Sequence, residues 1–151
     1  MTGKVFLLGL IVLGLVSSGG AERDAKPLQG LEPGAVYEKL NRARWNLDVM
    51  TIMACTSERI AIHADDVHTE LMRIRGTLPE SLDLRHQRIE GRVATLYYVG
   101  RRENRDEEHI VVSRGQVTMV LEQGVWRLRH ESWEDIGTEP IVREHGEIPR
   151  W

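Results

Sequence analysis

The sequence predicts an α+β fold in which N-terminal helices pack on a curved antiparallel sheet. Apolar residues recur at helical spacing until Gly76. After Pro79 apolar and polar residues alternate, and turn-forming residues separate the alternating runs. Helices followed by consecutive strands favour one layer of helices on an antiparallel meander over an alternating, parallel α/β arrangement.

Residues 1–21 have the three-part pattern of a secretory signal peptide. Lys4 supplies positive charge, residues 5–16 form an apolar run, and the small residue Ala21 suits cleavage. That run amounts to about 18 Å of helix, which is short of a hydrocarbon core of ~30 Å, so we expect no stable membrane insertion once it is removed. We therefore expect a periplasmic or secreted protein, with residues 22–31 as a flexible lead-in.

Three helices are expected in the first half of the mature chain. Pro33 suits the first turn of a helix over 33–47, because its missing N–H needs no partner there. Asp48 is placed to cap a short second helix over 49–55. A third helix is expected to begin at Thr56 and to end at Gly76.

Four strands are expected after Pro79, and they cover residues 82–89, 93–99, 110–122 and 125–133. The charged run 101–108 is expected to form a solvated loop. Residues 136–151 show no clean period and are expected to form a C-terminal tail, so that the domain covers 32–135.

Strict alternation assigns each strand residue to one of two faces of the sheet. The residues expected to face the helices are Ala94, Leu96, Tyr98, Val117, Met119, Leu121, Trp126, Leu128 and His130. By the same count Asp83 and Glu131 face outward, so no carboxylate is expected on the inner face of the strands.

Three segments resemble the nuclear transport factor two-like superfamily, also called the cystatin-like cone fold. They are the opening helix 33–47 with Asp48 after it, the strand start 90–96, and the closing hairpin 115–133. The hairpin is similar to that of small secreted bacterial members of unassigned function. The resemblance covers 32–135 and implies a cone-shaped α+β domain, and this fold hosts enzymes as well as binding modules.

Composition and motifs narrow the function classes. The formal net charge of −3 argues against nucleic acid as a partner, because nucleic-acid binders need a concentrated basic surface. The single cysteine, Cys55, cannot form an internal disulfide.

His63 and His68 lie about 140° apart around a helix and cannot share a metal. We expect no metal and no cofactor.

The resemblance implies where a ligand site would lie. Enzymes of this fold, such as ketosteroid isomerase, use a tyrosine and a carboxylate inside an apolar cavity. The candidates for ligand binding here are Tyr98, His130, Tyr37 and Trp126. A histidine could move a proton and a tyrosine could stabilise an oxyanion, but the carboxylate base of the isomerase pattern is missing from the expected inner face.

We therefore expect a small exported binding or accessory protein, more readily than an enzyme. It would hold a small apolar ligand in the cone or present its sheet to a protein partner. One alternative is an isomerase- or dehydratase-type enzyme that uses Tyr98 and His130; another is a structural envelope protein without a ligand. A roomy apolar cavity would favour the first two functions, and an interior filled by side chains would favour the third.

Overall fold

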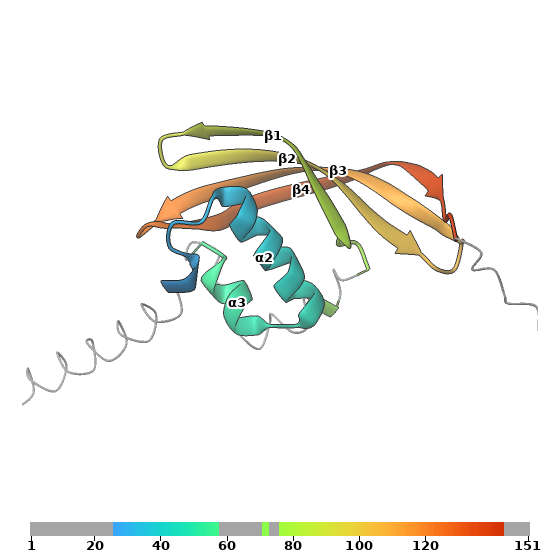
Figure 1. Ribbon diagram of the computed structural model, residues 1–151, viewed down its shortest axis with the longest axis horizontal. Coiled ribbons are helices and arrows are strands. Elements are labelled where there is room, and N and C mark those ends of the chain that lie inside the picture. The colour runs from blue at the N-terminus through green and yellow to red at the C-terminus, as the bar shows by residue number, and fades with distance from the viewer. Residues whose placement is uncertain (1–25, 58–70, 73–75, 144–151) are drawn as a thin grey trace, which may run out of the picture.

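The computed structural model describes residues 26–57, 71–72 and 76–143. It has the expected α+β architecture, in which α2 (Pro33–Asn46) and α3 (Val49–Ala54) pack on one face of an antiparallel four-stranded sheet (Figure 1). A short 3₁₀ helix, η1 (Lys26–Leu28), precedes them. The expected signal peptide lies outside the described residues, as does most of the expected third helix.

The sheet is a meander whose strands lie side by side in chain order. The strands are β1 (Ser81–Glu90), β2 (Val93–Asn104), β3 (His109–Glu122) and β4 (Val125–Pro140). The sheet curves along its length, and both helices lie beneath the same face (Figure 1). The candidate ligand-binding residues predicted from the sequence are expected in the interior between the two layers.

Helix α2 begins and ends as the sequence predicts. Pro33 occupies the first turn after the extended N-cap Glu32, and the helix ends where Leu47 takes a left-handed conformation with φ of 58°. The next residue caps α3, because the Asp48 carboxylate accepts a hydrogen bond from the backbone N–H of Thr51 at 3.2 Å. The two caps produce the sharp change of direction between the helices.

The core forms where one face of α2 meets the inner face of the sheet. The side chains of Val36 and Leu40 on α2 have no exposed surface, and the same holds for Leu96 on β2 and Val117 on β3. On β2 the inner-face residues expected from alternation are buried. Burial of such apolar surface is the main favourable contribution to folding.

Strands β2 and β4 are longer than the alternating pattern indicates. β2 continues to Asn104 through residues expected to form a charged loop, and β4 passes Trp133 and reaches Pro140. Arg101 Nε lies 3.1 Å from a Glu139 oxygen, and Arg102 Nη1 lies 3.4 Å from Asp135 Oδ1. Opposite charges on β2 and β4 thus compensate each other, so this charged segment is part of the sheet.

The expected flexible lead-in also differs from the structure in its second half. Leu28 is only 4% exposed and belongs to the hydrophobic core. The domain therefore begins at least as early as η1 rather than at Glu32. Within the described ranges no helix is long and apolar enough to cross a membrane.

Candidate functional site

Tyr37 and Tyr98 meet inside the domain, as their expected positions imply. Their ring centroids lie 5.2 Å apart with the rings tilted by 37°. Tyr98 is 1% exposed, and its hydroxyl donates a long hydrogen bond of 3.5 Å to the carbonyl of Gly34 on α2. Burial raises the pKa of Tyr98, so this phenol is protonated at neutral pH.

A β-bulge in β4 changes which residues point into the domain. Met119 of β3 pairs with Leu128, whereas the residue before Met119 pairs with His130, which leaves Arg129 as an extra residue. Arg129 and His130 are both exposed, and inward alternation resumes at Glu131. The expectation that His130 faces the interior and Glu131 the outside is therefore wrong, because strict alternation does not hold across a bulge.

Glu131, Tyr37 and Arg44 form a polar cluster between β4 and α2. The Tyr37 hydroxyl donates to Glu131 Oε2 at 2.5 Å. Arg44 contacts both carboxylate oxygens, with Nη2 at 2.6 Å from Oε1 and Nη1 at 3.1 Å from Oε2. The side chains of Arg44 and Glu131 are 9% and 20% exposed. Such a two-pronged, charge-assisted contact holds its partners in a defined orientation.

The cluster favours one protonation state. Burial raises the pKa of Glu131, but the charge and hydrogen bonds of Arg44 and the Tyr37 hydroxyl outweigh it, so the pKa lies below its ordinary value. Burial and the Glu131 charge raise the pKa of Tyr37 well above its ordinary value. At neutral pH the cluster is therefore a carboxylate between a neutral phenol and a guanidinium.

This arrangement is poorly suited to proton abstraction. A general base works best with a pKa near the operating pH, and the pKa of Glu131 is displaced in the opposite direction. Its oxygens already accept hydrogen bonds from α2. The structure thus supplies the inward carboxylate that the sequence pattern lacks, but in a state that ties α2 to β4.

Trp133 covers the sheet beside this cluster. It pairs with Gly115, where a Cβ atom would lie 2.5 Å from the indole ring, so only glycine allows this close approach. The indole N–H contributes to the lowered pKa of Glu131, yet Nε1 has no hydrogen bond of good geometry to the described residues. Trp133 replaces His130 as the aromatic side chain at this end of the interior.

The described interior is filled by side chains. The largest fully buried ones are Tyr37, Tyr98, Leu40, Leu96 and Met119. Trp126, the remaining candidate, is half-buried and packs against this core. Within the described ranges the interior near the two tyrosines is therefore a packed core. Other residues line two clefts that open to the outside.

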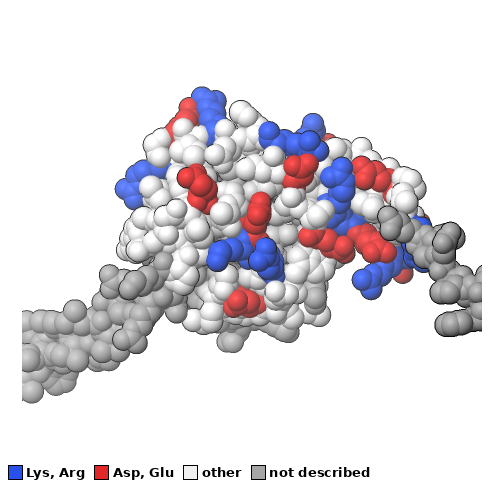
Figure 2. Space-filling view, in the orientation of Figure 1, with Lys and Arg blue, Asp and Glu red and all other residues white. Residues whose placement is uncertain are grey.

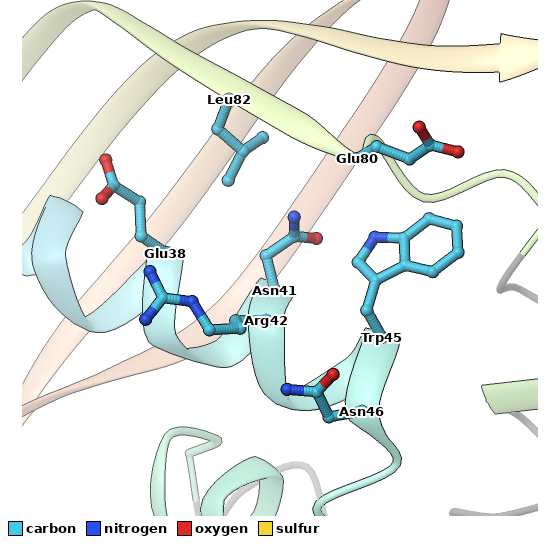
Figure 3. Close-up of a pocket in the computed structure, with 7 residues that line it drawn as sticks. All are labelled: Glu38, Asn41, Arg42, Trp45, Asn46, Glu80 and Leu82. Atoms are coloured by element: carbon cyan, nitrogen blue, oxygen red, sulfur yellow. The ribbon is translucent and has the colours of Figure 1, made fainter.

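One such cleft lies between α2 and the start of β1 (Figure 3) and has a volume of about 500 Å³. Polar side chains dominate its lining, which consists of Glu38, Asn41, Arg42, Trp45, Asn46, Glu80 and Leu82. We call it the α2–β1 cleft. Figure 2 shows acidic and basic side chains interspersed over the visible face, without a large area of either sign.

Asn41 is the buried polar residue of the α2–β1 cleft. It is 4% exposed, and its Nδ2 donates to the Pro79 carbonyl at 2.9 Å. Trp45 Nε1 donates to the same carbonyl at 2.9 Å. The Asn41 Oδ1 accepts no hydrogen bond from the described residues. Buried polar atoms are nearly always paired, so this acceptor marks a place where a donor is missing.

A second cleft, of about 510 Å³, lies near the β3–β4 turn. Its lining includes Ser57, Arg92, Glu122 and Arg129. Ser57 donates to the Glu122 carboxylate, and the Arg92 guanidinium donates to the Leu121 carbonyl. Ser57, Glu122 and Arg92 thus already have partners within the fold, unlike Asn41 Oδ1.

The sequence pattern did not identify Asn41, Arg44 or Glu131 as interior residues. A signal for the first two does exist, because both lie on the apolar stripe of α2 with Val36 and Leu40. A polar residue at a stripe position is expected to have a specific partner. Glu131 left no such signal, since its inward position depends on the bulge.

No protein-family model and no curated protein matches the chain. Among solved structures, it is similar to an NTF2-like protein of unknown function from Pseudomonas putida KT2440, with 19% identity and a TM-score of 0.48 over 66% of this chain and 80% of that one. It is also similar to Bd1075 of Bdellovibrio bacteriovorus, with 10% identity and a TM-score of 0.50 over 69% of this chain.

The chain covers only 39% of the Bdellovibrio protein, and at these identities the likeness concerns the fold alone. The architecture itself matches the one expected from the sequence, with helices on one face of a curved antiparallel meander. The chain thus has an α+β fold with the layout that the resemblance to the nuclear transport factor two-like superfamily implies.

Proposed function

We propose that this chain is a small exported binding protein without catalytic activity, and that its ligand occupies the α2–β1 cleft. The observation that carries the proposal is the Asn41 amide, which is buried in the lining of a cleft of about 500 Å³ with its oxygen unpartnered among the described residues. Ligand sites commonly combine a concave surface with a few polar groups that determine orientation.

The polar cluster inside the domain supports a scaffold role for the interior. An isomerase-type mechanism needs a carboxylate free to take a proton, whereas the Glu131 oxygens are engaged by Arg44 and Tyr37. The exposed His130 faces away from Tyr98, which weakens the alternative of an enzyme that uses this pair. The described interior is filled by side chains, which favours the structural alternative over a ligand inside the cone, and we therefore propose an outer rather than an inner ligand site.

Export rests on the pattern of residues 1–21 and remains part of the proposal. N-terminal sequencing of protein isolated from the cell envelope should find a first residue at or near Glu22. Recovery mainly of the intact form from the cytosol would contradict export without affecting the binding proposal.

Native mass spectrometry tests the binding site. Wild-type protein purified from the envelope should carry an added mass. Asn46→Trp places a large ring at the exposed end of α2 in the lining of the cleft and should abolish the added mass. The matched variant Ser132→Trp adds the same ring at an exposed site on β4 and should retain it. An added mass that survives Asn46→Trp would exclude this cleft as the site.

A further inference from the structure

We propose that the α2–β1 cleft recognises a protonated primary amine or a guanidinium group, and that this group lies between Asn41 and Glu80. The inference rests on the proposed function and names the chemical class of its ligand. Three features carry it: the balance of charge in the lining, the orphaned acceptor of Asn41, and the direction in which Arg42 points.

The lining has an excess of negative charge. It contains two carboxylates, Glu38 and Glu80, against one guanidinium, Arg42. Both glutamates are exposed, and neither forms an ion pair with a residue in the described part of the chain. By contrast, Glu134 on β4 pairs with Arg114 on β3 at 2.7 Å. The cleft carboxylates are therefore available to a cation from outside.

The Asn41 oxygen requires a donor. Its amide nitrogen is committed to the Pro79 carbonyl, which orients the oxygen, and Figure 3 shows that oxygen directed toward the side where Trp45 and Glu80 lie. An ammonium group brings three N–H donors and a guanidinium brings five, whereas a carboxylate or phosphate ligand brings acceptors. A donor reaches this covered oxygen when Asn41 rotates and gives up its hydrogen bond to the Pro79 carbonyl, which Trp45 Nε1 continues to satisfy.

Arg42 divides the cleft into two ends. In Figure 3 its guanidinium extends toward the Glu38 side, away from Trp45 and Glu80. Its charge therefore offsets that of Glu38 more than that of Glu80. The unopposed acceptors, Glu80 and Asn41 Oδ1, lie at the other end, where the Trp45 ring forms a wall. A cationic group is expected at this end, with the rest of the ligand toward Arg42.

The test is an NMR titration of the processed protein with four small probes. Pentylamine and butylguanidine carry the proposed group, pentanol is neutral, and pentanoate is anionic. The two cations should shift the backbone signals of Asn41 and Glu80, and the other two probes should bind at least about tenfold more weakly. A fifth probe, Nα-acetyl-lysine amide, distinguishes the lysine side chain of a peptide from a small free amine as the source of the cationic group. If the source is a peptide, this probe should bind more tightly than pentylamine.

Matched variants locate the cation. Glu80→Gln should weaken pentylamine binding about fivefold to tenfold, and Glu38→Gln should weaken it less. Glu103→Gln, which removes an exposed carboxylate on β2 outside the cleft, should leave it unchanged. Asn41→Leu should also weaken binding, with the thermal midpoint measured alongside to detect any loss of folding. Equal affinity for Glu80→Gln and wild type would overturn the inference.

The outcomes distinguish the inference from the proposed function. If pentanoate or pentanol shifts the cleft signals and the two cations do not, the cleft remains the binding site and the cation assignment fails. If no probe shifts these signals and the envelope-derived protein carries no added mass, both proposals fail. If the cations bind as strongly to Asn46→Trp as to wild type, they bind elsewhere and the inference fails.

Discussion

Glu131 is the residue on which the contact between the two layers depends most. Its carboxylate accepts hydrogen bonds from the Tyr37 hydroxyl and from both terminal nitrogens of the Arg44 guanidinium. All three side chains are largely buried. Burying a charge is costly unless it is paired and hydrogen-bonded. Once the pair exists, removal of one partner leaves the other charge buried without compensation, and this cost far exceeds that of losing an exposed ion pair.

Glu131→Gln should lower the free energy of unfolding by about 2–4 kcal/mol at pH 7, because Arg44 then remains buried without its counter-charge. The matched change Glu134→Gln, on the same strand, removes an exposed ion pair to Arg114 and should cost less than about 1 kcal/mol. Urea unfolding of both variants measures the difference. Similar losses in the two variants would show that the buried cluster contributes little.

The pH dependence has a definite sign. Although burial raises it, the folded-state pKa of Glu131 lies below its ordinary value because of Arg44 and Tyr37. The stabilisation is therefore present above the unfolded-state pKa of about 4.3 and is lost as the pH falls through the folded-state value. Wild type should lose more stability than Glu131→Gln between pH 6 and pH 3. Parallel curves for the two proteins would contradict this.

At the scale of elements, the bulge in β4 decides which residues face α2. It places two consecutive exposed residues, Arg129 and His130, between the inward Leu128 and the inward Glu131. Bulges of this kind redirect side chains while the strand keeps its partner. Removing the extra residue would thus restore regular alternation without turning Glu131 away from the helix.

Deletion of Arg129 should therefore be tolerated, with a loss of less than about 2 kcal/mol, because Leu128 and Glu131 both keep their inward positions. Deletion of Arg127 is the matched control. It shifts Leu128 to the outer face and should unfold the protein or cost well above that amount. Circular dichroism and urea unfolding compare the two. Greater damage from the Arg129 deletion would show that the bulge itself is needed for the fold.

For the whole molecule, the segment after α3 joins the helical layer to the sheet. The backbone N–H of Leu128 donates to the carbonyl of Cys55 at 2.7 Å, and the N–H of Ser57 donates to the carbonyl of Leu128 at 2.8 Å. The Cys55 side chain has no exposed surface. Burial raises its pKa to about 11, so the thiol is protonated and covered in the folded protein.

Cys55 should consequently report global unfolding. At pH 8 an aromatic disulfide reagent should label folded protein at the rate of unfolding, and it should label urea-unfolded protein within seconds to minutes. A cysteine introduced by Ser132→Cys at an exposed site should react at once in the folded protein. If Cys55 reacted as fast as that control, the segment between the layers would open locally, and the two layers would not unfold as one unit.

Most of the fold could be predicted from the sequence, because its signals are local. Pro33 and Asp48 mark helix starts through their own backbone chemistry, and alternation after Pro79 reports strands with one buried face. The strand ends were less accurate. Arg101 and Arg102 look like loop residues until Glu139 and Asp135 are seen beside them, and these partners are distant in sequence.

The sequence by itself determined the class of fold, the order of the elements and the inward position of Tyr37 and Tyr98. Only the tertiary structure decided the inward position of Glu131 and the exposure of His130, because one extra residue reverses the alternation and no residue type marks it. The orphaned Asn41 oxygen likewise became visible only when α2 and Pro79 were brought together, since hydrogen-bond satisfaction depends on partners that the fold supplies.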